Sequence, residues 1–263
     1  MIAKLTVTKK VCLIILILYF ITALASDFIM PFETDDFSHD ALLRPSSKHL
    51  LGTDEMGRDI FSMLLNGFKT TIFISLVSGL LSTLTGITLA FISCLYKGKV
   101  DGVIFHLSNL FLIVPEIIII MFFTVFSKPD MINTILSIVF FSWSKVYKIA
   151  RSKIMGCMEK NKVKYTMLMK GNIVDLCKKL YFDLYPVAVT CFILQCNKAV
   201  MYETTLSFFG IGDPLSKTWG KLIKSAMNYE NLFYDDVIIW YLIPAILCVF
   251  VYVLSLSLLT FEE

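Results

Sequence analysis

Six segments of the chain are long and apolar enough to cross a lipid bilayer, and they constrain its fold more than any other feature. A transmembrane helix needs about 20 mainly apolar residues, because the hydrocarbon layer is about 30 Å thick. Six segments approach this length, at residues 11–30, 70–96, 103–126, 132–150, 186–209 and 237–260. Apolar residues make up 57% of the chain and charged residues 17%, whereas soluble domains average about 45–50% and about 25%. We therefore predict an all-α membrane protein with about six transmembrane helices.

The first apolar segment has two interpretations. Lys4, Lys9 and Lys10 precede an apolar run that ends in A-L-A-S, a pattern that is also typical of a secretory signal with a small-residue cleavage site. We favour an uncleaved anchor helix at residues 1–30. An extracytoplasmic segment at 31–69 and a five-helix core at 70–263 would then follow. Because five further spans come after the first, the membrane prediction holds under either interpretation.

The distribution of basic residues predicts the orientation of the chain in the membrane. Lys and Arg are enriched in cytoplasmic loops. With the N-terminus inside, the cytoplasmic side carries thirteen basic residues and the outer side eight. Eight of the thirteen lie in one long inner loop at residues 151–185. We therefore expect both termini in the cytoplasm, as an even number of spans requires.

Several kinds of chemistry have no sequence signal. The seven cysteines include no C-x-x-C pair, and the three histidines are scattered, so neither a disulfide framework nor a metal site is predicted. The chain has no G-x-x-x-x-G-K-[ST] loop to hold a nucleotide phosphate. Its net charge of +3 does not indicate a nucleic-acid partner. We expect no catalytic residues and no cofactor on this chain.

A polar, turn-rich stretch follows the first span. Residues 44–59 read R-P-S-S-K-H-L-L-G-T-D-E-M-G-R-D, in which the glycines permit backbone bends and the charged residues can pair and cap one another. The stretch resembles the outer segment of permease subunits in ATP-binding-cassette importers of the dipeptide, oligopeptide and nickel type. The residues that carry this candidate motif are Gly52, Thr53, Asp54, Gly57, Arg58 and Asp59.

A second string supports the same resemblance. Residues 203–212 read E-T-T-L-S-F-F-G-I-G and are followed by W-G at 219–220, which is similar to the E-x-x-L-S-F-L-G-x-G and S-W-G patterns of these permeases. Both strings occur in the family's order, each beside a predicted membrane boundary. The resemblance covers residues 43–244. It implies a type I importer permease fold in the bacterial cytoplasmic membrane.

The resemblance also implies partners. This chain would form half of a translocation pore together with a second, homologous permease subunit. Two ATPase subunits would supply ATP hydrolysis and hold ATP and Mg, and an extracytoplasmic substrate-binding protein would deliver the substrate. Relatives of this kind carry peptides, nickel or metal chelates (metallophores), and the sequence does not choose among them.

The inner loop at residues 151–185 is the candidate contact with the ATPase. Family members carry an E-A-A-x-x-x-G motif there, but this chain has no Glu-Ala-Ala. Counting from Trp143 places the family glycine near Gly171, and counting back from Pro186 places it near Ile173. A basic loop lying against anionic lipid is the alternative. The candidate coupling residues are Tyr165, Thr166, Met167, Leu168, Met169, Lys170 and Gly171.

Polar side chains inside the predicted spans are the other candidates for function, because charge in a bilayer is costly and usually faces a partner or a pathway. For Glu116, beside Pro115, two interpretations are open: its carboxyl lines a translocation path, or it pairs with another side chain within the helix bundle. A polar stripe at helical spacing on the fifth span lines a translocation path or forms hydrogen bonds between helices. The stripe and its neighbour are Cys191, Gln195, Lys198, Tyr202 and Glu203.

Two other classes of function remain open at the level of the sequence. An ATP-independent secondary carrier or channel would need midplane ionisable groups and paired broken helices, of which Glu116 and Pro115 are the only hint. A non-transporting membrane scaffold would follow if the diverged inner loop binds no ATPase. Capture of an ATPase subunit separates both alternatives from the importer.

Overall fold

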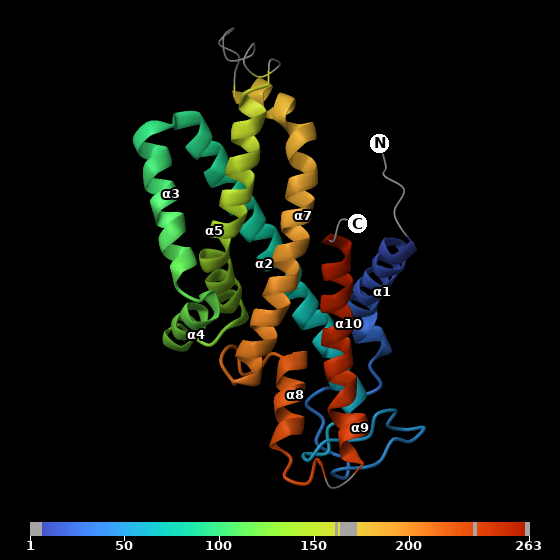
Figure 1. The fold of residues 1–263 in the computed structure, drawn as a ribbon. Helices are drawn as coiled ribbons and strands as arrows, with labels where there is room; N and C mark the ends of the chain where they lie inside the picture. The colour runs from blue at the N-terminus through green and yellow to red at the C-terminus, as the bar shows by residue number, and fades with distance from the viewer. Residues whose placement is uncertain (1–6, 161–162, 164–172, 234–235, 261–263) are drawn as a thin grey trace.

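The computed structural model describes residues 7–160, 163, 173–233 and 236–260. Its regular structure in these ranges is helical, apart from one isolated β-bridge between Thr53 and Asp59. The described helices, shown in Figure 1, are α1 (Val7–Ile29), α2 (Ile60–Tyr96), α3 (Gly98–Ile113), α4 (Glu116–Phe126), α5 (Met131–Met158), α7 (Ile173–Phe208), α8 (Trp219–Asn228), α9 (Val237–Tyr241) and α10 (Ile243–Thr260).

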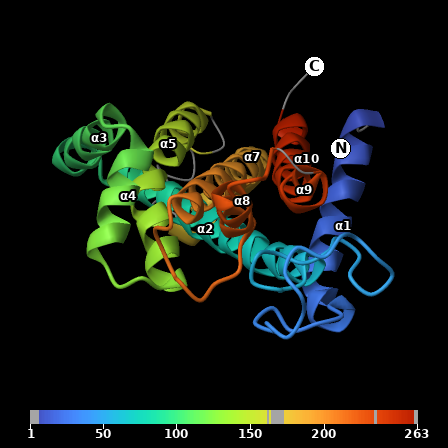
Figure 2. The ribbon, with the colours of Figure 1, turned by 90° about the horizontal axis from the view of Figure 1, so that it is seen from below.

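Helix α2 lies at the centre of the bundle. It packs against α1, α5 and α7, and Figure 2 shows it running between α3, α4 and α5 on one side and α1 and α10 on the other. From Ser75 to Cys94 its buried residues are small, which lets neighbouring helices approach closely. A Cβ atom on Gly79 would lie 2.5 Å from Cys196 Sγ in α7, and one on Gly86 would lie 2.6 Å from Val146 Cβ in α5.

The two ends of the bundle differ. One end, which we call the motif end, carries residues 31–59 and helix α8 (Figure 1). At the opposite end, which we call the loop end, α5 finishes and α7 begins. The start of α1 and the end of α10 also point toward the loop end in Figure 1. This arrangement is consistent with an even number of passes through the bundle.

Four helical segments in the described ranges are long and apolar enough to cross a membrane, and a bent pair makes a fifth if its two helices form one span. The four are Val7–Ile29, Ile60–Tyr96, Lys178–Phe208 and Val237–Thr260. Helix α5 is 28 residues long but is more polar, because Lys145, Lys148 and Arg151 lie in its second half. The chain is therefore a multi-pass membrane protein, and the count of six spans remains a prediction.

The third predicted span is not one straight helix. It divides into α3 and α4, whose axes differ by 90°. The break falls at Pro115, which has no amide hydrogen to donate and disfavours helical geometry in the residue before it. Val114 accordingly adopts an extended conformation, with φ −89° and ψ 137°. The bend places Glu116 in the first turn of α4.

Two predicted boundaries also change. Helix α2 begins at Ile60, ten residues before the predicted start of the second span, because Asp59 caps it there. The described parts of the inner loop predicted at 151–185 are largely helical, since α5 continues to Met158 and α7 begins at Ile173. Long helices therefore extend beyond the apolar segments from which they were predicted.

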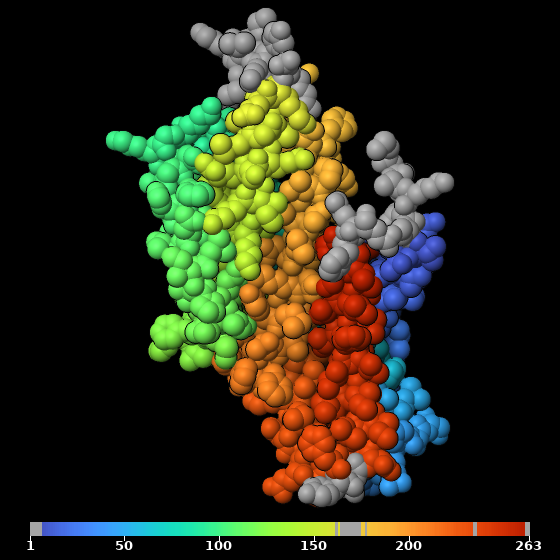
Figure 3. Space-filling view, in the orientation of Figure 1, coloured from blue at the N-terminus to red at the C-terminus, as the bar shows by residue number. Residues whose placement is uncertain are grey.

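Much of the outer surface is apolar. Large side chains on α1 and α4 are well exposed, and Phe122 and Phe126 of α4 are 65% and 76% exposed. Figure 3 shows α7 and α10 side by side along the visible face. Apolar exposure on this scale is expected for helices that face lipid or another subunit rather than water.

Candidate functional site at the motif end

The first motif folds back onto the start of α2 through Asp54. This carboxylate accepts hydrogen bonds from the backbone amides of Met56 and Arg58, at 2.9 and 2.8 Å, and from Arg58 Nε at 2.7 Å. Arg58 Nη2 lies 2.7 Å from the same carboxylate. Asp54 is fully buried, so its charge depends on these donors. The pair fixes the position of Arg58 at the edge of the motif.

Asp59 connects the motif to the first turn of α2. Its Oδ2 accepts from the backbone amide and the hydroxyl of Ser62, both at 2.8 Å, which satisfies a free amide at the helix start. Its Oδ1 lies 2.9 Å from Nδ1 of the buried His49. Gly57 has a φ of +79°, and a Cβ atom there would lie 2.1 Å from the carbonyl oxygen of His39. Only glycine fits this turn without strain.

The second motif packs beside the first. Trp219 is fully buried at the start of α8, and its indole Nε1 donates to the carbonyl of Leu64 in α2 at 3.3 Å. Glu203, which is 1% exposed, accepts from the Ser207 hydroxyl at 2.7 Å. Gly220 lies where a Cβ atom would be 2.5 Å from the carbonyl oxygen of Thr204. The two strings, far apart in the sequence, therefore form one structural unit.

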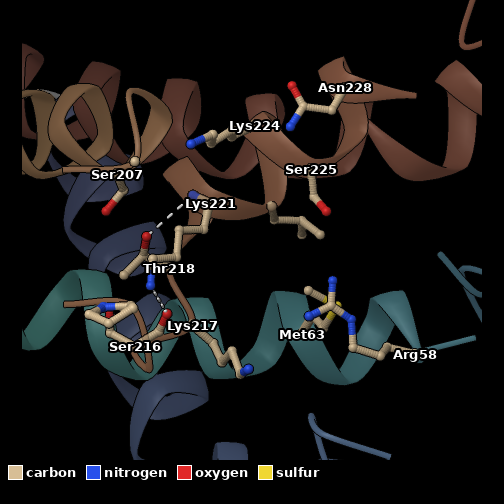
Figure 4. A pocket seen from close by; sticks show the side chains of 13 residues that line it. Arg58, Met63, Ser207, Ser216, Lys217, Thr218, Lys221, Lys224, Ser225 and Asn228 are labelled. Atoms are coloured by element: carbon tan, nitrogen blue, oxygen red, sulfur yellow. Dashed lines mark hydrogen bonds between the residues drawn. The ribbon is translucent and has the colours of Figure 1, made fainter. Parts of the chain in front are cut away.

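A pocket of about 320 Å³ opens between the two motifs (Figure 4). Arg58, just before α2, and Met63 in its first turn line one side, and α8 with the loop before it lines the other. Lys221 donates to the carbonyls of Asp213 and Ser216. The remaining lining residues are Ser207, Gly210, Pro214, Lys217, Thr218, Leu222, Lys224, Ser225 and Asn228.

The pocket is basic. Four of its lining side chains are cationic, and none is acidic. Arg58 is paired with Asp54, and Lys217 forms an ion pair with Asp35. Burial lowers the pKa of Lys221, and the neighbouring Asp213 acts in the opposite direction. The sequence analysis singled out Arg58 but did not connect it with these lysines, because the loop and α8 approach α2 only in the folded chain.

The members of the polar stripe on α7 have different partners in the fold. Gln195 donates to the carbonyl of Ser142 in α5 at 3.0 Å, and Cys191 is buried. Glu203 instead accepts from Ser207, one turn further along α7 at the end that packs against α8. Two members of the stripe, Lys198 and Tyr202, meet Glu116 at the start of α4.

Glu116 is the centre of an ionic cluster that links three helices. Lys198 forms an ion pair with it, and the Tyr202 hydroxyl donates to its Oε2 at 3.0 Å. Lys145 Nζ of α5 lies 3.6 Å from Oε1. The side chain of Glu116 is 6% exposed and that of Lys198 is 16% exposed. The carboxyl therefore has its charge partners within this chain.

The loop end contains an ion pair that the sequence analysis missed. Arg151 of α5 donates two hydrogen bonds to Asp101 of α3, at 2.7 and 2.6 Å, in bidentate geometry. Ser93 also bonds to Asp101, and its Oγ lies 2.9 Å from the hydroxyl of Tyr147. Arg151 and Asp101 are 50 residues apart in the sequence, so no local sequence pattern predicts that they meet. The candidate coupling residues, Tyr165 to Gly171, lie outside the described residues.

No metal site is found in the ranges that the structure covers, where no group of three His, Cys, Asp or Glu side chains is placed to hold an ion. His39 and His49 do approach each other, with ring centroids 4.6 Å apart. Both pack against Phe32 in an aromatic cluster. These histidines therefore contribute to the packing of the 31–59 segment.

The fold and the two motifs define the class: a multi-pass helical membrane protein whose motif end is built from permease-type sequence patterns. No family model matches the sequence. The chain is 25% identical over 229 residues to a di/tripeptide transport system permease protein of Pseudomonas aeruginosa, covering 82% of this chain and 75% of the relative. It is 26% identical to a dipeptide transport system permease protein of Haemophilus influenzae, covering 82% and 77%.

A third relative is named for a different substrate. A glutathione transport system permease protein of Pectobacterium atrosepticum is 26% identical over 210 residues, which cover 77% of this chain and 69% of the relative. These similarities confirm the resemblance that the two motifs predicted. The chain is therefore similar to permease subunits of peptide and glutathione transport systems.

Proposed function

We propose that this chain is one permease subunit of an ATP-driven importer and forms half of its translocation pore. The observation that carries this proposal is the similarity to three transport permeases over at least 77% of the chain. A second, homologous permease subunit would complete the pore. Two ATPase subunits would bind ATP and Mg, and an extracytoplasmic binding protein would present the substrate.

We propose peptides as the substrate class. The three relatives named above transport dipeptides, di- and tripeptides or glutathione according to their names, and none of these names mentions nickel or a metal chelate. Small peptides and glutathione share amide bonds and free carboxylates. The location we propose is the bacterial cytoplasmic membrane, with both termini in the cytoplasm.

We further propose that the α7 stripe borders the translocation path. Lys198 and Tyr202 are tied to Glu116, which follows the 90° break between α3 and α4. Charged groups inside a membrane bundle commonly mark such paths. Alternating access would move α4 and α7 relative to each other and exchange these contacts. The stripe residues of this proposal are Cys191, Gln195, Lys198, Tyr202 and Glu203.

The test is uptake combined with capture of partners. A strain lacking the chain should lose uptake of labelled dipeptides and regain it when the gene is restored. Affinity purification of the chain should recover an ATPase subunit in stoichiometric amount. Uptake that persists without any ATPase would indicate a secondary carrier instead. Absence of both uptake and ATPase capture would favour a membrane scaffold.

A further inference from the structure

The basic pocket at the motif end holds positive charge that no ion pair among the described residues neutralises. Asp54 pairs with Arg58 and Asp35 pairs with Lys217. Lys221 and Lys224 then remain as the unpaired cations of the lining, three residues apart on α8. Side chains three positions apart share one face of a helix, so both amines belong to the same wall of the pocket.

Neither of these two lysines has a carboxylate partner in the described part of the chain. Lys221 donates to two backbone carbonyls, those of Asp213 and Ser216, which carry no formal charge. The Asp213 carboxylate is engaged by the backbone amide of Leu215 at 2.8 Å. The Lys224 amine lies over Gly210, where a Cβ atom would be 2.2 Å from its Nζ.

Glycine at position 210 therefore makes room for the Lys224 amine. Its φ of +75° already favours glycine, and any side chain would also occupy the place of the ammonium group. The second motif thus sets the position of a cation in the pocket. Ser225 and Asn228 add neutral hydrogen-bonding groups to the same lining, whereas the Ser207 hydroxyl already donates to Glu203.

We propose that this pocket binds a carboxylate group. A carboxylate offers two oxygens that accept several hydrogen bonds, and ammonium and hydroxyl donors match it. The Asp213 carboxylate lies nearby and offsets part of the positive charge of the two lysines. The pocket therefore suits a monoanion better than a doubly charged phosphate. A volume of about 320 Å³ accommodates a carboxylate together with a small attached group.

Two sources can supply this chemistry. One is the C-terminal carboxylate of a small peptide, and the other is an Asp or Glu side chain of a protein that approaches the motif end. The inference does not rest on the proposed transport function, because carboxylate binding is measured on the chain without transport. Uptake can therefore fail while the pocket binds, and the reverse also holds.

The experiment measures how fast the Lys224 amine reacts with a water-soluble acetylating reagent. The full chain is reconstituted in lipid nanodiscs, and labelling at each lysine is followed by mass spectrometry. Dialanine is compared with dialanine amide, which lacks the terminal carboxylate. A capped tripeptide, acetyl-Ala-Glu-Ala-amide, is compared with its Gln counterpart. Inorganic phosphate is the fifth probe, and Lys128 in an exposed segment is the internal control.

We expect a carboxylate probe at twice its Kd to slow Lys224 labelling about threefold, while its neutral counterpart and the Lys128 rate show no change. Protection by dialanine alone would show that the pocket binds the C-terminal carboxylate of a peptide. Protection by the Glu peptide alone would show that it binds an acidic side chain of a protein. Protection by both is also consistent with the proposal. Equal protection by neutral counterparts, protection by phosphate alone or no protection at all would overturn it.

Variants test whether the pocket itself is responsible. Lys221→Gln should lower the affinity of the pocket for the protecting probe roughly tenfold, as expected for the loss of one charge-assisted contact. Asn228→Ala, at an exposed lining position, should weaken it less and provides a second variant if Lys221→Gln does not fold. Lys48→Gln removes an exposed cation outside the lining and should have no effect. Unchanged affinity in both pocket variants would refute the assignment.

Discussion

The ionic cluster around Glu116 makes a quantitative prediction about the stability of the bundle. Replacing Lys198 with Met keeps most of the side-chain stem but removes the ammonium group, so that a carboxylate with 6% exposure loses its buried partner. Breaking a buried ion pair by removing one side costs about 3–5 kcal/mol. Lys145, at 3.6 Å and 59% exposed, still offers partial compensation. We therefore expect a loss near the low end, about 3 kcal/mol.

The double variant supplies the control. Glu116→Gln combined with Lys198→Met removes both charges, and the Gln side chain can still accept the hydrogen bond from Tyr202. A buried ion pair replaced on both sides is often close to neutral in stability. We expect the double variant to be within about 1 kcal/mol of the parent chain. Because both single variants are expected to lose stability, the coupling energy between the two substitutions should then exceed about 2 kcal/mol.

The assay is reversible unfolding of the purified chain by SDS in mixed micelles, followed by loss of helix. The single variants should unfold at lower SDS fractions, and the double variant should return close to the parent. If Lys198→Met is as stable as the parent, or if the double variant is as unstable as the singles, Glu116 does not depend on this partner. That result would refute the reasoning.

The same double variant also tests the proposed translocation path. If Glu116 and Lys198 serve packing alone, a stable double variant should transport at the parental rate. If the charges face the path, transport should remain impaired although stability is restored. Parental transport in the double variant would assign the stripe to contacts between helices.

Three further predictions concern topology, coupling and packing. Cysteine in place of Ser46 should react with an impermeant maleimide in intact cells, whereas cysteine in place of Lys162 should react only after lysis; labelling of both in intact cells would reverse the predicted orientation. Truncating residues 167–169 to alanine should reduce ATPase recovery and uptake, because each large side chain removed from a contact forfeits about 1.5–3 kcal/mol; full recovery and uptake would place the contact elsewhere. Gly86→Ala should lower stability in the SDS assay by about 1–3 kcal/mol, since its Cβ would lie 2.6 Å from a neighbouring side chain, whereas Gly156→Ala, with nothing within 4 Å, should not.

The sequence determined the class of fold and the resemblance to transport permeases. Hydropathy alone predicts helices in a membrane, because a backbone in lipid must satisfy its own hydrogen bonds. The two motif strings predicted the homology to transport permeases, since turns and close contacts restrict residue identity at positions such as Gly57. The break at Pro115 also follows from local chemistry. These features depend on neighbours in the sequence, and each can be read without the fold.

The small-residue face of α2 is a signal that is already present in the sequence. Residues at spacings of three and four, including Gly79 and Gly86, identify the face along which α5 and α7 approach. Hydropathy identified this segment as a span but did not show that it lies at the centre of the bundle. Small-residue periodicity would have indicated close packing, although not the identity of the partner helices.

Only the tertiary structure decided which polar groups meet. Glu116 and Lys198 are 82 positions apart in the chain, Asp101 and Arg151 are 50 apart, and Arg58 shares a pocket with lysines of α8. Periodicity on α7 placed Glu203 beside the polar stripe, yet the fold directs it to a different contact. Such pairs depend on how helices cross and on which faces they present. A local sequence pattern fixes a residue's position on its own helix, whereas the packing of several helices decides its partner.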